Sequence, residues 1–115
     1  MRTSSAKAKG RRLQQRVVAD LLATFPTLTP DDITSRSMGA SGSDVLLSGA
    51  AAALFPYAVE CKNTERLALW DAFSQANANA GDLRAPLLVV SRNRWDPLAV
   101  LDWEDFLALC RLARR

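Results

Sequence analysis

The chain has no histidine among its 115 residues. This absence excludes Ser-His-Asp and Cys-His nucleophilic sites, zinc centres built on histidine ligands, and nucleases whose general base is histidine. Any hydrolytic chemistry must therefore use carboxylates, lysine, polar groups and a metal ion.

Cysteine and long apolar runs are also scarce. Cys61 and Cys110 are the only cysteines, and no Cys-x-x-Cys spacing indicates a zinc site. We interpret both as reduced thiols packed in the core. No run of about 18 apolar residues predicts a membrane span, and residues 1–16 lack the apolar segment of a signal peptide. We therefore expect a cytoplasmic protein that does not contact membranes.

Positive charge is small in total but uneven along the chain. The formal net charge is +3, yet six basic residues precede the first acid, Asp20. They are Arg2, Lys7, Lys9, Arg11, Arg12 and Arg16. Together with Arg92, Arg94 and the basic C-terminus they could form a surface that binds phosphates. The alternative is a solvated tail whose charge only aids solubility.

The pattern of apolar and turn residues predicts one α/β domain at residues 10–115, preceded by a flexible basic arm at residues 1–9. We expect helices at residues 10–25, 63–80 and from Asp102 onward, the last burying Trp103, Phe106, Leu107 and Cys110. We expect strands at residues 33–38, 44–47, 56–62, 86–91 and 98–101. The order αβββαββα predicts a mixed sheet flanked by helices, in which the middle helix crosses over to a parallel strand.

The strand at residues 56–62 carries the strongest functional signal, Glu60-Cys61-Lys62. Because side chains alternate along a strand, Glu60 and Lys62 share one face and Cys61 lies on the other. A hairpin centred near residue 52 would place Asp44 opposite Glu60, with Cβ atoms about 4.5–5.5 Å apart. Two carboxylates that close repel each other unless a cation lies between them.

This combination suits a magnesium-dependent phosphodiesterase. Mg²⁺ is bound through one or two carboxylates while it keeps several waters, and it polarises phosphoryl oxygens. Asp44 and Glu60 could supply those ligands, and Lys62 could orient water or stabilise charge on the phosphate. Gln75 lies on the polar side of the following helix, either as a surface residue or as a group directed at this site.

The chain resembles the PD-(D/E)xK nuclease superfamily, and more narrowly the small Holliday-junction-resolvase-like endonucleases of phages and archaea. The residues that carry the resemblance are Ser41-Gly42-Ser43-Asp44, then Val59-Glu60-Cys61-Lys62, then Gln75. The literal Pro30-Asp31 belongs to a helix-cap pattern, so Asp44 is the better match. Gln14 and Gln15 stand where relatives often carry a glutamate, which weakens the case for a second metal ion.

The resemblance implies a restriction-endonuclease-like fold and cleavage of DNA with Mg²⁺ or Mn²⁺, in the host cytoplasm if the protein is phage-encoded. Asp44, Glu60 and the Cys61 carbonyl would bind the ion, Lys62 would act on water, and Gln75 would orient Lys62 or contact DNA. The expected DNA contacts are Lys7, Lys9, Arg11, Arg12, Gln15, Arg36, Ser41, Ser43, Arg92 and Arg94.

Recognition by branch structure is the favoured interpretation, because little in the chain could read bases. The alternatives are a nicking or restriction-type nuclease on linear DNA, a non-catalytic DNA-binding module that retains the fold, and a small protein whose acids are only surface charges. A homodimer that uses Trp103 or the region of Trp95 is a further expectation, because two symmetric incisions need two sites.

Overall fold

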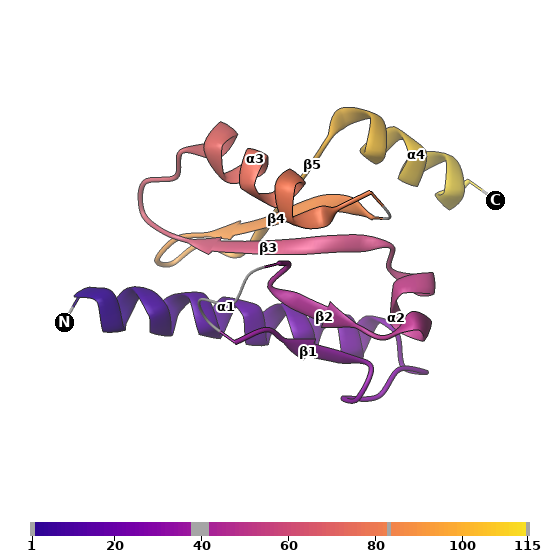
Figure 1. The fold of residues 1–115 in the computed structure, drawn as a ribbon, viewed down its shortest axis with the longest axis horizontal. Coiled ribbons are helices and arrows are strands. Elements are labelled where there is room, and N and C mark those ends of the chain that lie inside the picture. The colour runs from indigo at the N-terminus through magenta and orange to yellow at the C-terminus, as the bar shows by residue number, and fades with distance from the viewer. Residues whose placement is uncertain (1, 38–41, 83, 115) are drawn as a thin grey trace.

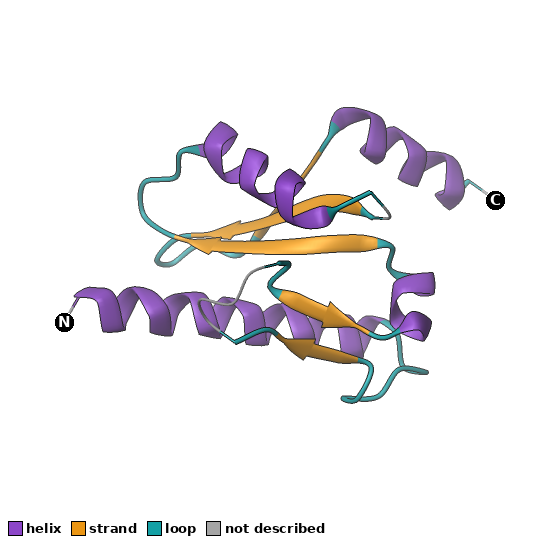
Figure 2. Ribbon diagram, viewed as in Figure 1, coloured by secondary structure: helices purple, strands orange, loops and turns teal. Residues whose placement is uncertain are grey.

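The computed structural model describes residues 2–37, 42–82 and 84–114, with four helices and five strands in these ranges (Figures 1 and 2). In chain order they are α1 (Arg2–Thr24), β1 (Ile33–Ser35), β2 (Val45–Leu47), α2 (Gly49–Leu54), β3 (Tyr57–Asn63), α3 (Leu69–Ala80), β4 (Ala85–Ser91), β5 (Leu98–Leu101) and α4 (Trp103–Ala113). The expected α/β class with a mixed sheet and flanking helices is confirmed. The short helix α2 is an addition to the predicted order.

Hydrogen bonding divides the strands into two groups. β1 and β2 pair antiparallel, while β3 pairs parallel with β4, and β4 pairs antiparallel with β5. The parallel pair is joined through α3, as the sequence predicted. β2 lies between β1 and β3 in Figure 1, but its ladder is with β1 and not with β3.

Helices α1 and α3 cover opposite faces of β3. The face toward α1 is apolar: Leu13, Val17 and Leu21 of the helix belong to one buried cluster with Val59 and Cys61 of the strand. The face toward α3 is lined differently, because Ala72 and Ala76 of that helix pack on Leu88 of β4. Figure 1 shows α1 and α3 on either side of β3. Small side chains on α3 therefore leave room beside the strand for polar groups.

Two predicted helix starts are wrong. The first helix begins at Arg2 rather than near Gly10, because alanine and lysine favour helix and no proline interrupts residues 2–24. The helix predicted at residues 63–80, which is α3, begins at Leu69. Asn63 extends β3 instead, because it pairs in register with Ser91.

The expected burial of the last helix is also wrong. α4 begins as predicted, with the Asp102 side chain accepting a hydrogen bond from the Glu104 N–H, but it buries no residue. Trp103 is 68% exposed, and Phe106 and Cys110 are exposed as well. Helical periodicity identified the apolar stripe correctly, but of its four residues only Leu107 is half-buried and the others are exposed. No helix in the described ranges is both long and apolar enough to cross a membrane.

Candidate active site

Asp44 is held against β3 by two hydrogen bonds. Its N–H donates to the Val59 carbonyl at 2.8 Å, and its Oδ2 accepts from the Cys61 N–H at 2.7 Å. These contacts bracket Glu60 on the strand, so Asp44 and Glu60 are neighbours as predicted. The predicted hairpin between the strands at residues 44–47 and 56–62 is wrong. Asp44 alone bonds to β3 from that segment, and its carbonyl accepts from the Arg36 N–H, just after β1, at 2.8 Å.

Glu60 is a buried acid, with only 5% of its surface exposed. Its Oε1 accepts a hydrogen bond from Asn79 Nδ2 of α3 at 3.1 Å. Burial raises the pKa of Glu60, and the negative charge of Asp44 raises it further, while Asn79 and Lys62 lower it in part. Burial likewise raises the pKa of Asp44, against the Cys61 N–H and the charges of Lys62 and Arg36. Both acids therefore resist ionisation.

Lys62 lies two residues after Glu60 on the same face of β3, half-buried. Its positive charge lowers the pKa of both acids, which places it beside the pair. Lys62 and Gln75 line one cavity of about 240 Å³. Gln75 is exposed, and it lies one helical turn before Asn79 on α3. The helix thus presents one amide beside Glu60 and another beside Lys62.

Arg36 approaches the pair from the end of β1. Its Nε donates to the Ser43 carbonyl at 2.6 Å, and its charge acts on Asp44. Gly42 permits this approach, because its φ is +96° and a Cβ there would lie 3.1 Å from an Arg36 terminal nitrogen. Gly42 is therefore suited to this position for two reasons. It adopts a left-handed backbone without strain, and it leaves space for the Arg36 guanidinium group.

A cavity of about 370 Å³ is lined by Asn79, the partner of Glu60, and by Ser43 and Val45 on either side of Asp44 in the chain. Arg36, Arg84, Ser43 and Ala58 contribute to its lining. Ser43 Oγ also donates to the Asn79 carbonyl at 3.4 Å, which ties the loop before Asp44 to the end of α3. Two guanidinium groups and the polar side chains of Ser43 and Asn79, against the single carboxylate of Asp82, make this cavity suitable for an anion.

The Cys61 carbonyl can also contribute at this site. In a strand the N–H and C=O of one residue point toward the same neighbour. Because the Cys61 N–H is directed at Asp44, its carbonyl lies on that edge too. The thiol itself belongs to the core opposite, where burial raises its pKa far above the usual range, so we assign it no reactivity.

The residues present fit a divalent ion of the magnesium type. No group of three or more His, Cys, Asp or Glu side chains that could hold a metal occurs within the described ranges. Mg²⁺ does not need one, because it uses one or two carboxylates and keeps several waters. Two acids with raised pKa values, one buried and one half-buried, form the donor set that a cation would stabilise.

The predicted DNA contacts fall into three groups. Arg36 and Ser43 lie at the site, and Ser41 lies outside the described residues. Arg92 and Arg94 are exposed between β4 and β5. The remaining contacts lie on α1, where Lys7, Arg11, Arg12 and Gln15 are exposed and Lys9 is half-buried. Gln14 is 4% exposed, which excludes it as a direct phosphate contact in this conformation. Asp31 is exposed in a turn away from these residues.

Sequence reasoning missed Asn79 and Arg84. The signal for Asn79 was its spacing of four from Gln75, which places both amides on one stripe of α3. Arg84 carried no comparable signal, because the loop that brings it to the cavity has no regular period. Comparisons with protein-family models, curated proteins and solved structures find no match to this chain.

Proposed function

We propose that this protein is a metal-dependent DNA endonuclease of the PD-(D/E)xK type, acting on branched DNA. The observation that carries the proposal is the gathering of Asp44, Glu60 and Lys62 on one side of β3, with both acids resisting ionisation. Two adjacent like charges, one of them buried, destabilise a fold, so they argue for a cation that the pair is built to bind.

Asp44, Glu60 and the Cys61 carbonyl would hold Mg²⁺ or Mn²⁺. Such an ion supplies polarisation of a phosphoryl oxygen and lowers the pKa of water. The chain's own groups do the rest. Asn79 fixes the Glu60 carboxylate, and the Cys61 N–H fixes that of Asp44. Lys62 would orient the attacking water or stabilise charge on the phosphate, and Gln75, which lines the same cavity, would position the ammonium group.

Phosphate binding is the second part of the proposal. Arg36 and Arg84 line the anion-suited cavity next to the acids. The exposed cations of α1 extend this surface along the helix. Contacts of this kind bind phosphates without reading bases, which favours recognition of DNA shape over sequence.

A cleavage assay tests the proposal. A four-way junction and a linear duplex with the same arm sequences are incubated with the protein in Mg²⁺, Mn²⁺ or EDTA. We expect metal-dependent cleavage of the junction in preference to the duplex. Lys62→Ala should lower the rate by about 10²–10³-fold, the usual cost of removing one group that stabilises developing charge. Asp44→Asn and Glu60→Gln, which keep their hydrogen-bond acceptors, should lower it at least as much.

Glu104→Gln is the matched control, since Glu104 is an exposed acid on α4 remote from the site. It should cleave like the parent. If the parent cuts none of these DNAs, the hypothesis of an enzyme is rejected. If the protein nevertheless binds DNA at low salt, the hypothesis of a non-catalytic DNA-binding module is favoured. A Lys62→Ala variant as active as the parent would reject the site assignment alone.

The homodimer stays a prediction. Trp95 and Trp103, the residues expected at such an interface, are 61% and 68% exposed. The mass in solution at micromolar concentration checks it, and a monomeric mass counts against two coordinated incisions.

A further inference from the structure

A third cavity, of about 290 Å³, lies where β4 turns into β5. Its walls include Leu67, Val90 and Leu98, and Trp95 and Arg92 contribute to its edge. Pockets for drug-sized ligands hold roughly 300–1,000 Å³, so this one suits a group about as large as a single ring system. The proposed cleavage mechanism makes no use of it.

Trp95 is exposed in an environment suited to a flat ligand. Trp95 is 61% exposed although it borders an apolar cavity, and the Arg92 Cζ lies 6.0 Å from the ring centre. A tryptophan face and a guanidinium group are the two surfaces on which nucleobases stack. An exposed indole beside a cation therefore favours a base over an aliphatic side chain.

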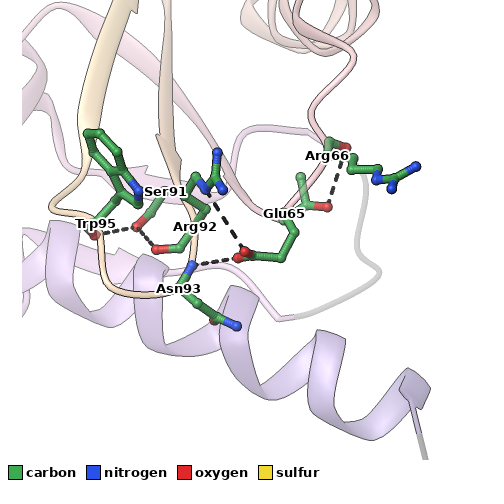
Figure 3. Close-up of polar contacts among 7 residues, drawn as sticks. Glu65, Arg66, Ser91, Arg92, Asn93 and Trp95 are labelled. Carbon is green, nitrogen blue, oxygen red and sulfur yellow. Dashed lines mark hydrogen bonds and ion pairs between the residues drawn. The ribbon is translucent and has the colours of Figure 1, made fainter.

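The turn that carries these residues is fixed by Glu65 (Figure 3). Glu65 Oε2 accepts from the Asn93 N–H at 2.6 Å, and Glu65 Oε1 lies 3.9 Å from Arg92 Nε. Ser91 Oγ donates to the Trp95 carbonyl at 3.0 Å across the same turn. These contacts hold the turn in place before any ligand binds, which lowers the entropic cost of binding.

Arg94 adds an unusual backbone to this turn. Its φ is +68°, and it is the only non-glycine residue with positive φ in the described ranges. Such a backbone conformation is strained for a non-glycine residue. Glycine would occupy the position without strain, so the arginine side chain is the reason to look for a function there. Arg94 is an exposed cation next to Trp95 in the chain, which suits a phosphate that adjoins a base in the cavity.

The cavity shares part of its wall with the cavity that contains Lys62 and Gln75. Thr64 and Leu67 line both this cavity and the one that contains Lys62 and Gln75. The link follows from the fold, since the chain leaves β3 just after Lys62 and passes between the two cavities before α3 begins. A nucleotide seated against Trp95 would belong to the strand that reaches Lys62.

We propose that the Trp95 cavity binds an unpaired nucleobase of DNA, with Arg94 and Arg92 beside the adjoining phosphate. This inference rests on the proposed function and specifies its substrate: DNA with unpaired nucleotides next to the scissile bond. Glu65 and Asp96 also line the cavity. Glu65 is engaged by Arg92 and Asn93, and Asp96 is 97% exposed near Arg16, so neither places an unpaired charge against the base.

Binding without metal tests the inference independently of cleavage. Fluorescence anisotropy in EDTA compares a labelled single-stranded oligonucleotide, a duplex with a short single-stranded gap, and a blunt duplex. Trp95→Ala should weaken binding of the first two by about 5- to 150-fold, the loss typical of one stacked base, and of the blunt duplex by less than about 2-fold. Trp95→Phe should restore most of the affinity.

Trp103→Ala is the matched control, since it removes an equally exposed tryptophan on α4. It should bind all three DNAs like the parent. Arg94→Gly should keep the turn, and it should lower the dependence of binding on salt by about one phosphate contact.

Equal weakening of all three DNAs by Trp95→Ala, or the same loss from Trp103→Ala, would overturn the inference. No effect of Trp95→Ala on any DNA would overturn it too, and would favour a protein side chain as occupant. Selective loss with a protein that never cleaves DNA would support the inference and reject the endonuclease. If the protein cleaves junctions and Trp95→Ala changes neither binding nor cleavage, the endonuclease proposal is supported and the inference is overturned.

Discussion

The two faces of β3 differ more than any other two regions of the molecule. Toward α1 the strand presents Val59 and Cys61 to an apolar core formed with Leu13 and Val17. Toward α3 it presents Ala58, Glu60 and Lys62, and there Asn79 reaches Glu60. One face contributes burial free energy of about 25 cal/mol per Å² of apolar area. The other carries ionisable groups that resist burial in their charged form, so it lowers stability.

The largest effect we expect comes from moving a charge to the wrong face. Val59→Glu would bury an unpaired carboxylate among the side chains of α1, because Val59 is 1% exposed in that cluster. We expect a loss of at least about 4 kcal/mol, a large part of the stability of a small domain. Urea unfolding followed by circular dichroism would measure it.

Ala58→Glu is the control, one residue away and equally buried at 3% exposure. Ala58 faces the cavity that contains Arg36 and Arg84, so a carboxylate there meets cations and room. This variant should stay folded. Equal destabilisation by both substitutions would show that the faces of β3 do not differ in the way proposed.

The sequence predicted the contrast between the two faces of β3 as far as it follows from the alternation of side chains along a strand. Alternation along residues 57–63 assigned Glu60 and Lys62 to one face and Cys61 to the other, and the structure has them so. Spacing also placed Asp44 near Glu60, although as a single link and not a hairpin. These features follow from local geometry, which a sequence carries directly.

What sequence did not predict depends on loops and on tertiary partners. Asn79 and Arg84 reach the site only because α3 crosses back over β3 and its exit loop folds toward Arg36. The exposure of α4 was also missed, because an apolar stripe looks the same whether or not a partner covers it. The Trp95 turn needed a contact to Glu65, twenty-eight positions away in the chain.

A smaller effect should come from the amide that supports Glu60. Asn79→Ala removes the hydrogen bond that lowers the pKa of Glu60, so the folded-state pKa should rise further. Above that pKa the acid is ionised and the variant should lose about 1.5 kcal/mol. As pH falls and Glu60 takes up a proton, the loss should shrink. Thermal unfolding in EDTA between pH 4 and pH 8 would show it.

Asn77→Ala controls for this measurement, since Asn77 is exposed on the same helix. Its effect should stay within about 0.5 kcal/mol at every pH, as for most surface substitutions. A loss for Asn79→Ala that is constant with pH would indicate that the amide supports packing and not the charge of Glu60.

The smallest effect, and the one that joins the two faces to function, is a gain in stability. Glu60→Gln keeps an acceptor for Asn79 but removes a charge that burial and Asp44 oppose. The raised pKa means that the parent loses stability as pH rises from the ordinary carboxylate range through the folded-state pKa, and the loss persists above it. In EDTA at pH 7 the variant should therefore be more stable by about 1 kcal/mol, visible as a rise of about 4 °C in melting temperature, with no gain near pH 3.

Millimolar Mg²⁺ should reverse the order of the two melting temperatures, because an ion that binds only the folded parent stabilises it by mass action. If Mg²⁺ raises both melting temperatures equally, the acid pair is not the metal site, and the polar face of β3 needs another explanation.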